Sequence, residues 1–277
     1  MIPIVIPYYK NRKRLRLCRK HLKKQTVNGL DVHVVNDSRK ASGYTKAVNR
    51  GLRHYLAKPH GWDYIVVLDQ DMYLDPDAIE QFVKFMDTHP HCGVAVALQR
   101  LYDRPVFAQG GGHDCIPVGV VEEAHITFYT KDTPVFWGDI ACCMIRKECL
   151  WDIGLLDENF NFVCSDSDFT LTARSKGWEV WVPHKVRGIH QRGDAAAEKK
   201  SSPHLMKQIG QDIALFRLKW EKSDYYNVLK YEPTKPIFTI RDGEFVQPGG
   251  WEVKKPPKPV LGCSDGLLQY NMVTENG

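Results

Sequence analysis

Acidic residues follow two short apolar segments of the sequence at the points where those segments end. Residues 32–36 lead into Asp37, and residues 64–68 lead into Asp69 and Asp71. Runs rich in β-branched residues are typical of strands, and open α/β sheets bind ligands beyond the carboxyl ends of their strands. Two acids one residue apart suit Mg²⁺ or Mn²⁺ bound with a substrate diphosphate, because these ions prefer oxygen ligands. The alternative is that Asp69 and Asp71 only end a strand and cap the next turn.

The elements that must position these acids alternate between strands and helices from residue 2 to about residue 182, which predicts βαβ units and a largely parallel sheet. We expect strands at residues 3–7, 32–36, 64–68, 93–98, 141–145 and 179–182. Helices are expected over residues 12–24, 43–56 and about 166–177. One more helix should begin with Asp75 as its N-cap and Pro76 at its first position.

The chain changes character after residue 190. Residues 199–229 predict one or two helices, and the Pro- and Gly-rich sequence from Tyr231 predicts an extended tail with a hairpin around Asp242–Gly243. We therefore divide the chain into a catalytic α/β domain, residues 1–220, and an extension, residues 221–277, that packs on the domain or on a partner.

The composition is that of an ordinary globular protein. Of 277 residues, 43% are hydrophobic and 26% charged, which excludes wholesale disorder and a fibrous repeat. We find no signal-peptide pattern and no apolar run near the roughly 20 residues of a membrane-spanning helix, so we expect a cytoplasmic protein, with peripheral membrane contact left open. The eight cysteines form no CxxC pair and are expected to be free, buried thiols.

The net charge of +5 is concentrated in one segment. Between Lys10 and Lys24 there are nine basic residues and no acidic one. Such a helix is either a solvated surface or a binding surface for a polyanion or anionic lipid. Nucleic acid therefore stays among the partners that the sequence allows.

The order of several segments is more specific than any one of them. The chain contains IVIPYY, VVNDS, GYTKAVNRGL, VVLDQD, WGDIACCMIRKECL and GLLDENFNFVCSDSDFTLTARSKGWEVWV in that order. Over residues 2–193 this series resembles the family 2 glycosyltransferases, which transfer sugars from nucleotide-sugar donors. The resemblance implies the GT-A fold: a Rossmann-like, open, mostly parallel sheet flanked by helices, here with a C-terminal helical or extended extension.

The resemblance also assigns the donor site. Asp69 and Asp71 match the DxD motif that holds the metal and diphosphate, and His190 in VRGIHQRG is the third metal-ligand candidate. Lys46 is equally well explained as a solvated lysine, and Arg192 as a surface residue. The donor contacts implied are Pro7, Tyr8, Asp37, Lys46, Asn49, Asp69, Asp71 and Arg192.

The acceptor side carries the general base. The family uses an acidic pair near the start of a helix, which matches Asp166 as the base and Asp168 as a supporting residue. Ser165 stands where the family commonly has Glu, so Asp168 remains an alternative base. Both acids would also be favoured simply by the positive end of the helix. The acceptor contacts implied are Trp137, Gly138, Asp139 and His113.

The resemblance predicts an inverting transfer of a hexose from a UDP-sugar, with Mn²⁺ or Mg²⁺, to a hydroxyl of a saccharide or glycoconjugate. A transferase acting on hydroxylated bases of DNA is the first alternative, because of the basic segment. A catalytically inactive module that binds nucleotide-sugars or polyanions is the second. A sugar-phosphate nucleotidyltransferase ranks lower, because its glycine-rich N-terminal signature is absent.

Overall fold

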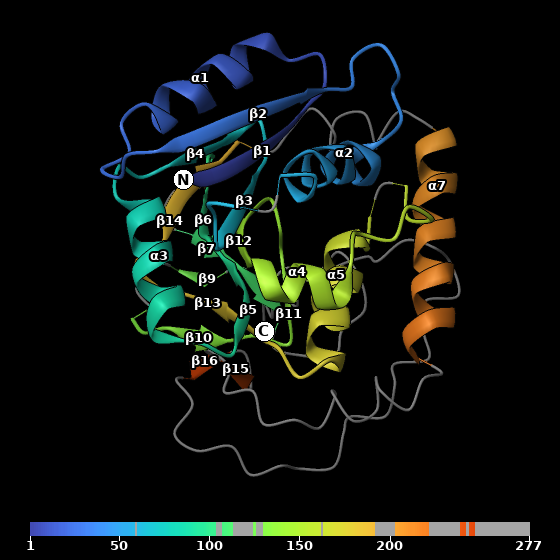
Figure 1. The fold of residues 1–277 in the computed structure, drawn as a ribbon. Coiled ribbons are helices and arrows are strands. Elements are labelled where there is room, and N and C mark those ends of the chain that lie inside the picture. Colours follow the sequence, from blue (N-terminus) through green and yellow to red (C-terminus); the bar gives the residue numbers. More distant parts are fainter. Residues whose placement is uncertain are drawn as a thin grey trace.

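A seven-stranded sheet forms the centre of the molecule (Figure 1). The structure is a computed structural model that describes residues 1–58, 60–103, 107–112, 124–125, 130–161, 163–191, 203–221, 239–241 and 244–246. Five strands of the sheet run in one direction, and the other two run against them, so the predicted mostly parallel sheet is confirmed. Its spatial order is β10 (Thr133–Pro134), β13 (Glu179–Val182), β5 (Cys92–Val96), β12 (Cys142–Arg146), β3 (Tyr64–Leu68), β1 (Ile2–Tyr8) and β2 (Leu30–Asn36).

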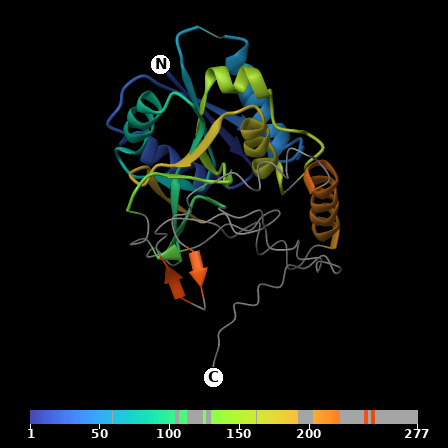
Figure 2. The ribbon, with the colours of Figure 1, turned by 90° about the horizontal axis from the view of Figure 1, so that it is seen from below.

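Helices cover both faces of this sheet (Figures 1 and 2). On one face, α1 (Arg12–Leu22) and α3 (Ala78–Thr88) pack against Ile4 and Ile6 of β1. On the other face, α2 (Tyr44–Leu56), α4 (Lys147–Ile153) and α5 (Ser165–Ser175) share a core with Val5. Since successive side chains of a strand point to opposite faces, β1 contributes to both cores, as expected for a strand buried on both sides.

A second sheet, which the sequence did not predict, extends one end of the first. It contains β4 (Met72–Leu74), β14 (Arg187–His190), β6 (Leu98–Leu101), β7 (Phe107–Gln109) and β9 (Ala124–His125), in that order. A short ribbon pairs β11 (Trp137–Gly138) with β8 (Gly111–Gly112). In the pairing of β14 with β4, His190 lies opposite Met72. This register brings the end of β14 next to the DxD segment.

The start of α3 differs from the prediction. The helix begins at Ala78, and Asp75 is not its N-cap. The side chain of Asp75 instead forms an ion pair with Arg100. Gln25, which follows α1, accepts a hydrogen bond from the backbone N–H of Ile79 (3.0 Å). The orphan amide of the first turn is thus satisfied from a residue that is distant in the sequence, and local spacing does not reveal it.

The chain after residue 202 adds helices to the side of α5 (Figure 2). These are α7 (Pro203–Phe216) and the π-helix η2 (Arg217–Glu221). Phe216 and Trp220 join a small apolar cluster with Trp137 and Phe160. Strands β15 (Thr239–Arg241) and β16 (Glu244–Val246) pair antiparallel where the hairpin was predicted. The domain boundary at residue 220 stays a prediction.

The cysteines and the lengths of the helices bear on two further expectations from the sequence. The six cysteines among them are free and buried, as predicted. Within the same part of the chain, no helix is both long enough and apolar enough to cross a membrane.

The contact of α2 with the central sheet requires glycine at position 51. A Cβ atom built there would lie 2.1 Å from Cγ1 of Val5 and 3.1 Å from Cγ2 of Val35. We therefore expect Gly51→Ala to lower the free energy of unfolding by about 1–3 kcal/mol, through overpacking. Denaturant titration measures the change.

Gly210→Ala is the matched control, because a Cβ atom at Gly210 in α7 would meet nothing within 4 Å. Removing an exposed helical glycine should raise the free energy of unfolding by up to about 1 kcal/mol. Equal effects of the two substitutions would contradict the packing described for α2.

Candidate functional site

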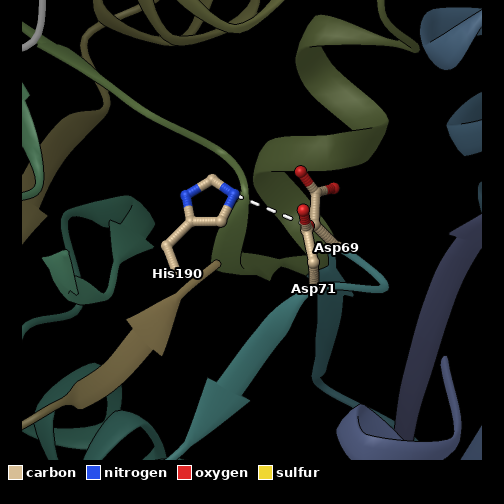
Figure 3. Close-up of side chains that lie close together, drawn as sticks. All are labelled: Asp69, Asp71 and His190. Atoms are coloured by element: carbon tan, nitrogen blue, oxygen red, sulfur yellow. Dashed lines mark ion pairs between the residues drawn. The ribbon is translucent and has the colours of Figure 1, made fainter. Parts of the chain in front are cut away.

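Two carboxylates and an imidazole converge beyond the end of β3 (Figure 3). Asp69 follows β3, Asp71 precedes β4, and His190 ends β14. One potential ligand atom from each side chain lies within 4.8 Å of the others. Nε2 of His190 is 3.6 Å from Oδ1 of Asp71. The structure thus brings together the three residues that the sequence proposed as metal ligands.

Gln99 determines which nitrogen of His190 faces the acids. Nε2 of Gln99 donates to the backbone carbonyl of Asp139 (3.3 Å), and a carbonyl can only accept. Oε1 of Gln99 therefore faces Nδ1 of His190 (2.8 Å), which must carry the proton. Nε2, the nitrogen that is left to bind a metal, then faces Asp71, as in histidine ligands whose other nitrogen is held by a hydrogen bond. Gln99 was not predicted as a site residue, because no local sequence pattern distinguishes it.

Asp69 is an unsatisfied acid in a negative environment. Its Oδ1 is buried without a hydrogen bond of ordinary geometry, and the nearby hydroxyl of Tyr44, which is buried in the same way, only partly stabilises the charged form. Burial, followed by repulsion from Asp71 and Asp139, raises the pKa of Asp69 well above its usual range. A cation would relieve both the repulsion and the missing partner. Carboxylate oxygens with one imidazole are suitable ligands for Mn²⁺, so the residues present fit a divalent ion.

A cation of the protein itself already contacts this group. Nη1 of Arg14, in the first turn of α1, donates to Oδ2 of Asp71 at 2.8 Å, and only 12% of the Arg14 side chain is exposed. In the sequence, Arg14 belongs to the basic segment from Lys10 to Lys24, and no local pattern connects it with the acids. The structure shows that this segment contributes a side chain to the site.

Asp37 is held rigidly at the end of β2. Its backbone N–H donates to the carbonyl of Tyr8 (2.9 Å), which joins the ends of β2 and β1. The side chain accepts from Ser42, from the Gly43 N–H and from Arg50. Although burial opposes it, these hydrogen bonds keep the pKa of Asp37 below its usual range. The carboxylate is therefore ionised and oriented, and Pro7 and Tyr8 lie beside it at the end of β1.

The two α2 residues assigned to the donor lie in different environments. Asn49 is completely buried, and its Nδ2 donates to the carbonyl of Leu156 (2.8 Å) and to Oε1 of Glu158 (3.0 Å). Both amide hydrogens are thus used to hold the loop after α4. Lys46 is half-buried, and its positive charge contributes to lowering the pKa of Glu158.

Asp166 and Asp168 both lie in the first turn of α5, yet they face different surroundings. Asp168 is buried and accepts hydrogen bonds from Nε1 of Trp220 (2.7 Å) and Nζ of Lys219 (3.0 Å), both from η2. The carboxylate of Asp166 accepts the backbone N–H of Ser167 (2.8 Å) and has no basic side chain among the causes that act on its pKa. Burial and, next, the negative charge of Asp139 raise the pKa of Asp166 to about 7.

The residues predicted to contact the acceptor also lie in different surroundings. Asp139 follows β11 and influences the pKa of both Asp69 and Asp166, so it belongs to the acidic group. Trp137 is 2% exposed and packs within the cluster of Phe160 and Phe216. The Gly138 N–H donates to Oγ1 of Thr170 (3.2 Å), which attaches β11 to α5. The remaining two predicted residues, His113 and Arg192, lie outside the described residues.

Comparisons with known proteins support the resemblance stated from the sequence. Residues 38–154 match the family model described as glycosyl transferase family 2. A search of curated proteins finds no match. Among solved structures, GalNAc-T7 with UDP, GalNAc and Mn²⁺ is similar with a TM-score of 0.57 and 12% identity, over 83% of this chain and 50% of that chain.

TarS of S. aureus is also similar, with a TM-score of 0.53 and 15% identity, over 83% of this chain. The match spans 42% of that TarS chain, and 70% of the chain of TarS residues 1–349 in complex with UDP-GlcNAc (16% identity, TM-score 0.53). These neighbours are glycosyltransferases of the GT-A fold, so the fold expected for this chain is confirmed.

The raised pKa of Asp166 gives a direct test of the acidic group. We expect the Asp166 carboxyl carbon to titrate near pH 7 in a ¹³C NMR experiment on aspartate-labelled, metal-free protein. Asp139→Asn should move the midpoint to lower pH, because removing a nearby negative charge favours the ionised form. The spectrum of Asp166→Asn assigns the resonance.

Asp152→Asn serves as the control, because Asp152 is an exposed acid of α4 that bonds to Trp178. It should leave the Asp166 midpoint unchanged. A midpoint near pH 4 in the unsubstituted protein would mean that Asp166 is solvated and that the acids do not form the group described.

Proposed function

We propose that this protein is a metal-dependent, inverting glycosyltransferase that moves a hexose from a UDP-sugar to an acceptor hydroxyl. The observation that carries the proposal is the convergence of Asp69, Asp71 and His190, which come from separate segments and supply hard ligands at one point. The family 2 match and the GT-A fold support the reaction class. Among the structural neighbours, the UDP-GlcNAc complex of TarS and the Mn²⁺ and UDP complex of GalNAc-T7 support the choice of donor and ion.

The proposed metal ligands are Asp69, Asp71 and His190. A bound Mn²⁺ or Mg²⁺ supplies charge that offsets the charge developing on the leaving nucleoside diphosphate. Gln99 positions His190, and its bond to the Asp139 carbonyl ties that imidazole to the acidic group. Within this arrangement, the protein holds the ligands in place before the donor arrives.

Asp166 is the proposed general base. A carboxylate with a pKa of about 7 is a stronger base than an ordinary aspartate and remains largely ionised in mildly alkaline solution. Its Oδ atoms accept the proton of the acceptor hydroxyl as that oxygen attacks the anomeric carbon from the face opposite the diphosphate. Asp168 is proposed as a positioning residue, because Lys219 and Trp220 already bind its carboxylate.

Donor recognition is proposed at the ends of β1 and β2. The Asp37 carboxylate accepts the imide N–H of uracil, and Tyr8 and Pro7 contact the nucleoside. Lys46, in the first turn of α2, is a further proposed donor contact. For Asn49 we propose a positioning role through the loop at Leu156, in place of direct donor contact. Arg192 remains the proposed diphosphate contact, and Asp139, Gly138, Trp137 and His113 the proposed acceptor side.

The proposed acceptor is a saccharide or glycoconjugate, and one observation favours a DNA acceptor as the second candidate. Eight basic side chains of α1 and its flanking residues are exposed, and such a concentration of positive charge suits a polyphosphate backbone. We name this the basic ridge: Lys10, Arg12, Lys13, Arg16, Arg19, Lys20, Lys23 and Lys24. A hydroxylated base of DNA would then receive the sugar. A module that binds nucleotide-sugar without turnover is the remaining alternative.

The proposed roles of Asp71 and Asp166 predict different kinetic defects. Asp71→Asn should lower Mn²⁺-dependent release of UDP from UDP-hexose by at least about 100-fold, because the metal ligand set is lost. Asp166→Asn should keep UDP affinity and lower transfer by about 100- to 10,000-fold. The assay uses the best acceptor from a screen of saccharides and hydroxymethylated DNA.

Asp168→Asn separates the two candidate bases. We expect it to lower the melting temperature by loosening η2, with a smaller loss of transfer than Asp166→Asn. Normal transfer by Asp166→Asn would show that the base is assigned wrongly. Full activity without added metal would overturn the metal dependence, and UDP binding with no turnover on any acceptor would favour the binding module.

Salt dependence of DNA binding tests the second candidate. If DNA docks on the basic ridge, log Kd for hydroxymethylated duplex should depend steeply on log salt, since each neutralised phosphate releases counterions. The triple substitution Arg16→Glu, Lys20→Glu and Lys23→Glu should weaken binding and lower the slope by about 0.9 for each phosphate that the variant no longer neutralises. The control variant changes the exposed Lys131, Lys176 and Lys185, which lie outside α1, to Glu. Equal weakening by both triple variants, or no binding, would exclude docking on the ridge.

A further inference from the structure

Arg14 is the one basic residue of the segment from Lys10 to Lys24 that the fold turns towards the acids. The other eight are exposed, whereas 12% of the Arg14 side chain is accessible. Asn11, the N-cap of α1, accepts the backbone N–H of Arg14 (3.1 Å) and so fixes this residue in the first turn. That turn contains no acidic residue, and the partner of Arg14 comes from the DxD segment.

The carboxylate of Asp71 lies between two nitrogen groups. Its Oδ2 accepts from Nη1 of Arg14 at 2.8 Å, while its Oδ1 lies 3.6 Å from Nε2 of His190. The two contacts are not equivalent, because the permanently charged guanidinium donates a direct hydrogen bond, whereas Nε2 of His190 lies beyond hydrogen-bond distance of Oδ1. One oxygen of the carboxylate is thus bound to a cation and the other faces the remaining ligand atoms.

A divalent ion held by Asp69, Asp71 and His190 would share the Asp71 carboxylate with this guanidinium. Two cations on one carboxylate repel each other, and the half-buried setting screens them less than bulk water does. A bound diphosphate would offer the guanidinium a second anionic partner, so that Arg14 can turn from Asp71 to the phosphate oxygens and leave the carboxylate to the ion. The cost of placing the ion beside Arg14 therefore depends on whether the donor is present.

We infer that Arg14 couples metal binding to donor binding: it weakens the affinity of the free protein for the divalent ion, and the bound donor relieves that weakening. The inference rests on the proposed function, since it requires a diphosphate donor at the Asp69–Asp71–His190 group. Arg14 acts through its charge, and its effect is that the ion and the donor bind together more favourably than the ion binds alone. Coupling of this kind is reciprocal, so the ion must strengthen donor binding by the same factor.

The test measures Mn²⁺ binding to the full chain by isothermal titration calorimetry, with and without UDP. In the unsubstituted protein, UDP should lower the Kd for Mn²⁺ by about tenfold or more. Arg14→Gln should bind Mn²⁺ about fivefold or more tightly without UDP and about equally with UDP, so that the coupling factor falls by about the same fivefold. Arg16→Gln, an exposed neutralisation on the same helix, should match the unsubstituted protein.

Two further variants separate charge from structure. Arg14→Lys keeps the charge and should keep most of the coupling, whereas Arg14→Ala should show the same loss of coupling as Arg14→Gln. Thermal melting identifies a variant that does not fold, and the other neutral variant then supplies the comparison. Coupling that is unchanged in the folded neutral variants, or lost equally in Arg14→Lys, would overturn the inference while leaving the proposed function intact. No Mn²⁺ binding by the unsubstituted protein, with or without UDP, would overturn both.

Discussion

Concentrated negative charge at the carboxyl end of the sheet is the constraint on which the rest of the site depends. Burial and the negative charges of Asp71, Asp139 and Asp166 raise the pKa of Asp69, and burial and the charge of Asp139 raise that of Asp166. Two like charges about 5 Å apart repel by about 3 kcal/mol at an effective dielectric constant of 20. That is a large part of the stability of an ordinary domain, so the fold must supply compensating groups.

The compensating groups come from elements far away in the sequence. Arg14 reaches Asp71 from α1, and His190 arrives through the pairing of β14 with β4. Lys219 of η2 neutralises Asp168, and Asp212 of α7 accepts the N–H groups of Asn161 and Val163 in the loop before α5. The second sheet and the C-terminal helices therefore have a common purpose: they hold the acids, and the loop that carries Asp166, in one arrangement.

The sequence predicted what is written in local patterns. Apolar runs in the sequence predicted every long strand of the central sheet, although β2 begins two residues before its predicted start. The position of Asp69 and Asp71 after β3 follows from the same pattern. Contacts that join distant segments could not be found in this way. Gln25 replaces Asp75 as the partner of the first turn of α3, Gln99 orients His190, and Asn49 and Trp137 are buried by neighbours that no spacing identifies. A polar side chain that was predicted to contact the ligand, such as that of Asn49, can instead form its hydrogen bonds with the protein's own backbone.

The separation of Asp166 from Asp168 shows how one helix turn can give two identical side chains different chemistry. Residues two apart on a helix point about 200° away from each other, so they cannot share an environment. The positive end of α5 favours the ionised form of both, and burial raises the pKa of both. At Asp168, Lys219 and Trp220 oppose that rise, whereas at Asp166 the charge of Asp139 adds to it. A carboxylate that is already neutralised by a lysine gains little from a proton, and one that is repelled by a second acid gains more. The register of α5 against β11 and η2, which sequence spacing does not encode, therefore decides which of the two acids is the better base.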